Sequence, residues 1–463
     1  MSVPSRNIYL GGPMPAIYAR TALPIVFMMT VNGLLTVTDA LFLGHYVGES
    51  ALAAVTLMFP LFMMIVAFAT VVASGMSSLL ARMLGAGNLE DAQTVYASAH
   101  WLALAVSGVL IALYLLCGPA AVLMAAGGNA GLAADATVYI RILVLSSPLM
   151  FVLSVNSDAL RNEGRAGTMA AMSLLVSVAN IGFNWLMIAV LQLGVAGSAY
   201  GTVAAQALAL VIVMAYRASG RAPLTPGMIA RQVTRRHWSR MLALGAPQSL
   251  GFIGISLGSS AMLAALQMTA SADYAVSAAA YGIVTRIMTL AFLPLLGLSQ
   301  AMQAITGNNH GAGLAPRVEK SLGFAVVTAL AFCACVEAVL IAFAPAVGRA
   351  FVADPQVVAK VASIMPAMVA LFLLVGPQMM IAAHFQATGD AGRAAILQLA
   401  KPYLFAVPMT FVLAAMAGER GIWWTGPAAE LLLLGLAAIV LVRGARIHSL
   451  RWGLFAVPIR PAA

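Results

Sequence analysis

The chain has 463 residues, of which 62% are hydrophobic and only 8% are charged, and its mean hydropathy is +0.98. A soluble domain of this size cannot bury so much apolar surface, so the composition excludes a soluble globular protein. The formal net charge of +10 does not indicate nucleic-acid binding, because the basic residues lie in short loops between apolar stretches and form no basic domain.

Twelve apolar stretches follow one another along the chain, and each is long enough to cross a bilayer core of about 30 Å. Stretches this long do not suit a transmembrane barrel, whose strands are about half the length and alternate in hydropathy. The predicted fold is therefore an all-α polytopic membrane protein with twelve transmembrane helices. The predicted spans are 15–40, 52–80, 95–117, 134–157, 168–191, 195–217, 240–268, 277–305, 320–345, 358–386, 396–417 and 422–443.

The lysines and arginines predict how these spans are oriented. With the amino terminus inside, 19 of the 24 basic residues fall on the inner side and three fall on the outer side. The inner set includes Lys401 and the run from Arg217 to Arg240. This bias follows the positive-inside rule and predicts a multi-pass protein of the inner (plasma) membrane with both termini cytoplasmic.

The chain also contains an internal repeat of six spans. Four landmarks recur at offsets of 223 to 226 residues: Pro24 with Pro247, Gly85-Ala86-Gly87 with Gly311-Ala312-Gly313, Gly164 with Gly389, and Gly194 and Gly197 with Gly418 and Gly421. Because six is even, both copies enter the membrane from the same side, which predicts two pseudo-symmetric six-helix bundles. We assign residues 1–217 to an N-lobe, 218–239 to a cytoplasmic linker, 240–447 to a C-lobe and 448–463 to a cytoplasmic tail.

Asp39 lies near the outer end of the first span, where a carboxylate costs about 2.5–3.5 kcal/mol on insertion scales. The task open to such a residue is binding a proton, a metal cation or a cationic solute. The alternative is a helix-end residue in contact with water. Pro24 lies on the same helix and frees a backbone carbonyl, so we expect ionisation or cation binding at Asp39 to change the bend of the first span.

Other polar residues at membrane depth are candidates to line a cavity. They are Asn32 on the first span, Tyr139, Arg141 and Asn156 on the fourth, Asn180 and Asn184 on the fifth, Thr202 and Gln206 on the sixth, and Arg286 and Gln303 on the eighth. Asn180 and Asn184 are four residues apart and share one helix face. Together with Asp39 and Thr202 they offer oxygens that suit Na⁺ or a protonated carboxyl, although interhelical hydrogen bonding is the alternative for the amides.

Two acidic residues, Glu337 and Glu430, lie well inside predicted spans of the C-lobe. Each is a candidate second coupling site or one half of a structural pair. No catalytic group and no cofactor are predicted, because the six histidines lie in loops, in tails or near span ends and form no cluster. A membrane-embedded enzyme would need clustered acids, bases or metal ligands inside the spans, so an enzyme is disfavoured.

Over nearly the whole chain, short motifs resemble those of the multidrug and toxic compound extrusion (MATE) transporters. The similar segments are Leu23-Pro24, Thr38-Asp39-Ala40-Leu41-Phe42-Leu43-Gly44, Ala51-Leu52-Ala53-Ala54-Val55 with Pro60, Arg82 to Ala92, Arg161 to Arg165, Asn180 to Asn184, Gly194 to Thr202, and Gly297 to Gly313. The resemblance implies two six-helix bundles in a V shape. It also implies efflux of cationic, amphipathic compounds in exchange for H⁺ or Na⁺ by alternating access.

Single residues also receive roles from the resemblance. The matched positions are the cation-coupling aspartate at Asp39, its polar partners at Asn180 and Thr202, and looser matches at Tyr139 and Asn156. Many relatives have an aspartate where Asn184 stands, and members with a C-lobe site have acidic residues that are absent here near Ile255 and Val375. One carboxylate would hold sodium less strongly than two, so the coupling ion is expected to be H⁺ rather than Na⁺.

Two other transporter classes share parts of this pattern. A major-facilitator transporter also has six plus six spans, but its usual Asp-Arg-x-Gly-Arg loop is absent from Arg82 to Ala92. A lipid-linked precursor flippase of the same superfamily is the closer alternative, although such proteins usually line their cavity with several cations and only Arg141 and Arg286 are candidates here. We expect a monomer that binds small cationic drugs or toxins and membrane lipid, without a nucleic-acid partner.

Overall fold

The computed structural model describes residues 7–127, 129–269, 274–447 and 450–456. Within these ranges, the side chains of residues 32, 34–41, 43–45, 49, 52 and 456 lie outside the description. The described chain is almost entirely helical and divides into two compact units, Met1–Ser249 and Leu250–Ala463.

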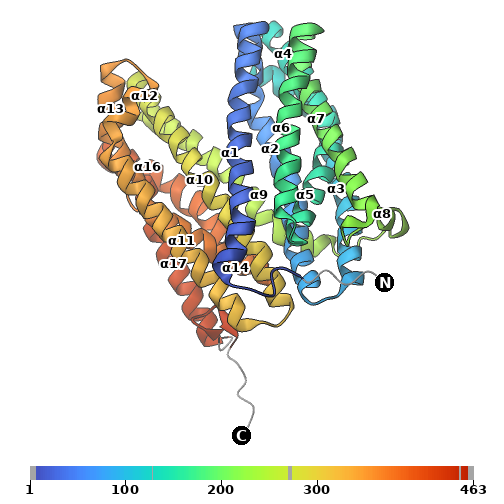
Figure 1. Ribbon diagram of the computed structural model, residues 1–463. Coiled ribbons are helices and arrows are strands. Elements are labelled where there is room, and N and C mark those ends of the chain that lie inside the picture. Colours follow the sequence, from blue (N-terminus) through green and yellow to red (C-terminus); the bar gives the residue numbers. More distant parts are fainter. Residues whose placement is uncertain (1–6, 128, 270–273, 448–449, 457–463) are drawn as a thin grey trace. The chain divides into compact units, whose positions relative to one another are not determined.

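In the first unit, long helices of the first repeat pack along one another. Figure 1 shows α1, α6 and α7 running side by side, with α2 and α3 in contact with α5. The elements are α1 (Met14–Tyr46), α2 (Glu49–Gly85), α3 (Leu89–Ala125), α4 (Ala130–Leu145), α5 (Ser147–Asn162), α6 (Ala166–Asn184), the π-helix η1 (Trp185–Val190), α7 (Gly194–Tyr216), the π-helix η2 (Arg217–Arg221), α8 (Gly227–Arg231) and the first turns of α9 (Trp238–Met268).

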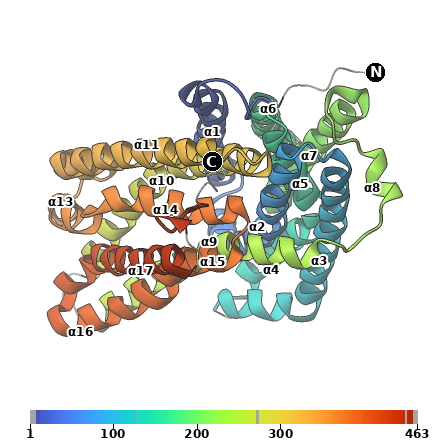
Figure 2. The same cartoon turned by 90° about the horizontal axis from the view of Figure 1, so that it is seen from below.

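The second unit repeats this succession of helices and ends in a short hairpin. In Figure 2, α14 lies between α11 and α17, and it contacts both. The elements are the rest of α9, α10 (Tyr274–Gly311), α11 (Ala315–Ala342), α12 (Ala344–Phe351), α13 (Pro355–Val369), α14 (Phe372–Thr388), α15 (Ala391–Leu399), the π-helix η3 (Ala400–Ala406), α16 (Val407–Trp423), α17 (Thr425–Ile447), and the antiparallel strands β1 (Leu450–Arg451) and β2 (Phe455–Ala456).

Among the described residues, ten helices are long and apolar enough to cross a membrane, and the number reaches twelve if two bent helix pairs each count as one span. The bent pairs are α4 with α5, at 48°, and α13 with α14, at 42°. They correspond to the fourth and tenth predicted spans, so both of those spans are broken. The breaks fall at Ser146 and Leu371, which are 225 residues apart, as the internal repeat predicts.

Several glycines of the internal repeat have a positive φ in both copies. Three pairs have positive φ in both copies: Gly87 and Gly313 (72° and 71°), Gly164 and Gly389 (81° and 93°), and Gly194 and Gly418 (59° and 59°). A residue with a Cβ atom rarely adopts these angles, so the same three turns need glycine in each unit. The repeat that the sequence predicts is therefore present in the backbone of both units.

The boundary between the units lies inside α9, whereas the lobes were predicted to divide at the loop before it. The first turns of α9 pack backbone against backbone on α2. A Cβ atom at Gly75 would lie 1.9 Å from Met241 O, and one at Gly245 would lie 1.8 Å from Val71 O. Because the two glycines allow this close approach, the start of α9 belongs to the first unit.

The linker before α9 is packed on α3 by two tryptophans. Trp101 donates its indole N–H to Ile229 O at 3.1 Å, and Trp238 donates its indole N–H to Ser98 O at 3.1 Å. Arg217, predicted at the inner end of the sixth span, is fully buried and pairs with Glu163 at 2.8 Å. The predicted linker is therefore packed against the first unit.

Candidate functional site

Three of the predicted coupling residues form one polar cluster between α6 and α7. Asn180 donates to Thr202 Oγ1 at 3.2 Å, and Asn184 donates to Asn180 Oδ1 at 3.3 Å. Thr202 in turn donates to the main-chain oxygen of Ser198 at 3.1 Å. Asn180 is 7% exposed and Asn184 is fully buried, so the two amides are shielded from solvent, whereas Thr202 is half-buried.

The local sequence explains why these side chains meet. Asn180 and Asn184 are one turn apart on α6, so both project from the face that packs on α7. Gly201 makes room for Asn184, because a Cβ atom there would lie 2.0 Å from Asn184 Oδ1. Directly after Asn184, the helix widens into η1, and π-helical turns of this kind occur frequently at functional sites.

Asp39 and Asn32 lie on α1, and their side chains are outside the described part of the structure. The helix itself contacts α6, η1 and α7. Phe42, one turn after residue 39, packs against an apolar cluster that contains Ile188 and Val195. Ile188 in turn follows Asn184 by one turn. Residue 39 and the amide cluster therefore lie at the same level of the first unit.

The other predicted cavity residues of the first unit occupy two different places. Tyr139 is half-buried and packs against the same apolar cluster as Phe42, and Gln206 is half-buried one turn after Thr202. Asn156 is fully buried elsewhere: it accepts from Tyr96 Oη at 2.7 Å, and its amide nitrogen lies 3.0 Å from His100 Nε2. Asn156 thus belongs to a separate network between α3 and α5.

In the second unit, the two predicted cavity residues are also apart. Arg286 is exposed on α10. Gln303 is 4% exposed and donates to Gln386 Oε1 at 2.6 Å, which links α10 to α14. Gln398 of α15 reaches the same Gln386 oxygen at 3.4 Å. Gln303 therefore takes part in an interhelical amide network.

The structure distinguishes the two acidic residues of the C-lobe spans. Glu337 on α11 accepts the backbone N–H groups of Leu371 at 3.1 Å and Leu373 at 2.8 Å. These groups start α14 after the break, where Leu371 has a φ of 65°, so Glu337 caps the broken helix. Glu430 instead forms an ion pair with Lys401.

Lys401 was counted among the inner basic residues, near the start of the predicted span 396–417. It is a residue of η3, inside the span Ala391–Trp423, where its ammonium group meets the buried Glu430. The predicted span began at residue 396 and left out the first turns of the helix, because these turns contain the charged Arg393.

A metal ion would need ligands beyond acidic side chains. The described residues contain no group of three or more His, Cys, Asp or Glu side chains that would hold one. A sodium ion near Asn180, Asn184 and Thr202 would depend on amide and hydroxyl oxygens and on Asp39. Carboxylate, carbonyl and hydroxyl oxygens are the donors that hard cations prefer, so the donor chemistry fits.

Comparisons with known proteins agree on one family. A family model described as MatE matches residues 24–186 and 252–412. The multidrug export protein MepA of Staphylococcus haemolyticus is 25% identical over 435 residues, which cover 93% of this chain and 92% of that protein. The FAD transporter of Shewanella oneidensis is 24% identical over 449 residues, which cover 95% of this chain and 96% of that protein.

The structural comparison shows the same fold. The outward-facing structure of a multidrug resistance MATE family transporter has a TM-score of 0.85 and 23% identity, and the match covers 94% of this chain and 97% of that one. A structure of a MATE transporter in a bent conformation also has a TM-score of 0.85, at 23% identity. The predicted twelve-span fold of two six-helix halves is confirmed by these matches and by the helices described above.

Proposed function

Because the chain belongs to the MatE family of transporters, we propose that it is a secondary active antiporter that exports cationic, amphipathic compounds in exchange for H⁺. The observation that supports this proposal is the cluster of two buried amides, Asn180 and Asn184, with the hydroxyl of Thr202, at the level of residue 39 on the neighbouring helix. Relatives named as multidrug export proteins support the substrate class.

The proposed exchange depends on one negative charge. A carboxylate among apolar helices attracts a proton or a cationic substrate, and in a medium of low dielectric constant it can neutralise one positive charge at a time. Asn180, Asn184 and Thr202 supply neutral hydrogen-bonding groups that accept either form of the carboxyl. Proton binding at Asp39 would then release the substrate on one side, and proton loss on the other side would restore the site.

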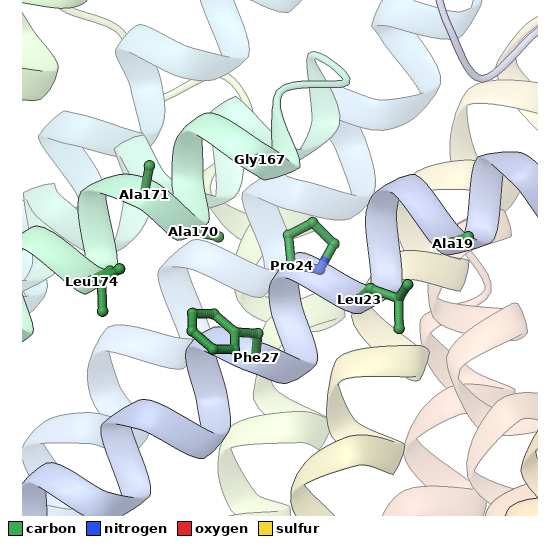
Figure 3. Close-up of a pocket in the computed structure, with 8 residues that line it drawn as sticks. All are labelled: Ala19, Leu23, Pro24, Phe27, Gly167, Ala170, Ala171 and Leu174. Carbon is green, nitrogen blue, oxygen red and sulfur yellow. The ribbon is translucent and has the colours of Figure 1, made fainter.

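The first helix has the features needed to respond to this exchange. Pro24 interrupts the hydrogen-bond ladder of α1, which favours a bend at that position. Figure 3 shows Pro24 and Phe27 of α1 facing Ala170 and Leu174 of α6 across an apolar groove of about 540 Å³. The small side chains of α6 leave this groove open. We propose that α1 moves along it when the charge of Asp39 changes.

The test is ethidium efflux from vesicles with separately imposed proton and sodium gradients. Asp39→Asn should abolish gradient-driven efflux while the protein still inserts and folds, because an amide does not bind and release a proton in the pH range in which a carboxyl group does. Glu90→Gln is the matched control, since it removes an exposed carboxylate at the start of α3. Full coupled efflux in Asp39→Asn would contradict the proposed mechanism.

The relative named as an FAD transporter suggests a second substrate class, an anionic dinucleotide. If the chain exported an anionic dinucleotide, Asp39→Asn would not weaken the attraction for substrate. Flux of FAD and of ethidium should therefore be compared in the same vesicles. Proton-driven export of FAD without export of ethidium would replace the cationic class by the anionic one, and sodium-driven export of ethidium would replace H⁺ by Na⁺ as the coupling ion.

A further inference from the structure

A second buried carboxylate lies in the second unit, away from the amide cluster. Glu430 is 3% exposed and sits within the second turn of α17, a helix long and apolar enough to cross a membrane. Two helices that pack against α17 supply its partners. Lys401 of η3 pairs with Glu430 Oε1, and Gln378 of α14 donates to Glu430 Oε2 at 3.2 Å.

The two members of the ion pair differ in their access to the surroundings. The side chain of Lys401 is 34% exposed, whereas that of Glu430 is 4% exposed. Lys401 therefore lies on the more exposed side of the pair, and Glu430 lies on its buried side. The π-helical turn that carries Lys401 also contains Pro402, which removes one backbone donor from the ladder next to the lysine.

Gln378 brings a carboxamide oxygen close to the ion pair of Glu430 and Lys401. The residue is 6% exposed, and its Oε1 is buried without a hydrogen-bond partner among the described residues. Because Oε1 belongs to the same carboxamide whose nitrogen binds Glu430, it lies beside the carboxylate. A buried carbonyl oxygen without a donor is costly, and a cation or an N–H group that reached it would remove that cost.

The surroundings suit the aliphatic stem of an amine. An apolar cluster along the same three elements contains Ala382, Ala400 and Leu433. The side chain of Lys401 is itself an alkyl chain that ends in a primary ammonium group, and this group forms an ion pair with the Glu430 carboxylate. The chain's own side chain thus shows which ligand chemistry this place accepts.

From these contacts we infer that Glu430 and Gln378 form a second cation site, specific for primary alkylammonium groups, which Lys401 occupies and which a substrate ammonium takes over when Lys401 withdraws. This inference rests on the proposed function, because it gives that export a substrate subsite in the second unit. It assigns to Lys401 the part of an exchangeable internal ligand. The exchange needs no net change of charge at Glu430.

The first experiment adds a free amine to the Lys401→Ala variant, to replace the part of the lysine side chain that the substitution removes. The probe is n-propylamine, which matches the three carbons and the nitrogen that the substitution removes, and the protein is purified in its presence. Propylammonium should raise the unfolding midpoint of Lys401→Ala saturably, and Na⁺ or 1-propanol should not. Lys401→Ala/Glu430→Gln is the matched control and should show no propylammonium effect. An equal effect in this control, or an equal effect of Na⁺, would overturn the inference.

The second experiment covers the case in which Lys401→Ala does not fold. Lys401→Met/Glu430→Gln removes both charges and keeps the side-chain volumes. Export of dansylcadaverine, which carries a primary alkylammonium arm, should fall about tenfold relative to export of ethidium. Equal changes for the two dyes would mean that the pair is structural only. Failure of the proposed function is distinguishable, because Asp39→Asn would then retain coupled export of both dyes, whatever the propylamine result.

Discussion

The two units share backbone turns but differ in where they hold charge. Each unit breaks its fourth span, at Ser146 in the first and at Leu371 in the second, and the two breaks are 225 residues apart. The break in the first unit keeps helical hydrogen bonds, since Ser146 N donates to Ile142 O at 3.0 Å. The break in the second unit has a left-handed residue and needs the carboxylate of Glu337.

This difference separates architecture from chemistry. Glycines with positive φ recur at matching places, so the repeat is carried by turn geometry. The polar residues inside the spans follow no such rule: the cluster of Asn180, Asn184 and Thr202 is neutral, whereas Gln378 in the second unit binds the charged pair of Glu430 and Lys401. The two units can therefore be perturbed separately, and matched substitutions should give different results.

The largest effect is expected at the helix break of the second unit. Glu337→Ala would leave the N–H groups of Leu371 and Leu373 without their charged acceptor, which should cost about 2–5 kcal/mol of unfolding free energy. The measurement is the unfolding midpoint in detergent. Glu337→Gln keeps one acceptor oxygen and should lose about half as much. If Glu337→Ala were as stable as the wild type and only transport changed, Glu337 would be a coupling residue rather than a cap.

Sequence reasoning located the elements that depend on local pattern. Span lengths follow from apolar stretches, and the contact between Asn180 and Asn184 follows from their spacing on one helix. The partners of Asn156 come from α3, and that of Gln303 comes from α14, so only the packing of distant segments reveals them. The coupling role of Asp39 stays a prediction.

Two buried ion pairs were missed for the same physical reason. Lys401 and Arg217 were counted with the inner basic residues near the ends of their predicted spans, because an isolated charge is costly among apolar helices. Each is paired with a glutamate that lies 29 or 54 residues away along the chain. A pattern read along the sequence cannot show that such a partner is close in space. Sequence reasoning therefore places the charge at the boundary between membrane and water.

The next effect tests the close packing of the first unit's cluster. Gly201→Ala would place a methyl group 2.0 Å from Asn184 Oδ1, so the amide must move away from Asn180. Overpacking of this kind should cost about 1–3 kcal/mol and reduce coupled efflux. Gly426→Ala on α17 is the control, because its methyl group would meet Met368 O at 3.5 Å, an ordinary contact. Equal stability of the two variants would show that Asn184 has room to shift.

A third substitution gives the first unit a second carboxylate. Asn184→Asp should strengthen sodium binding by about tenfold, roughly 1.4 kcal/mol, because a second negative charge favours a bound metal cation. The measurement is ethidium efflux driven by an imposed sodium gradient at fixed pH, which the variant should show more strongly than the proton-coupled wild type. Asn129→Asp makes the same change at an exposed helix cap and should have no effect. The same response to a sodium gradient in Asn184→Asp as in the wild type would place the coupling ion away from this cluster.

The smallest effect concerns the linker, which belongs to the first unit and has no described counterpart in the second. Trp101→Phe removes one hydrogen bond, from the indole N–H to Ile229 O, and should cost about 0.5–1.5 kcal/mol locally. Opening of the linker should therefore increase several-fold, which tryptic cleavage at the exposed Arg221 and Arg231 would report. Trp424→Phe, at a half-exposed indole in the second unit, should leave the cleavage rate unchanged. Identical cleavage of wild type and Trp101→Phe would mean that Trp238 alone holds the linker on α3, and Trp238→Phe should then produce the whole effect.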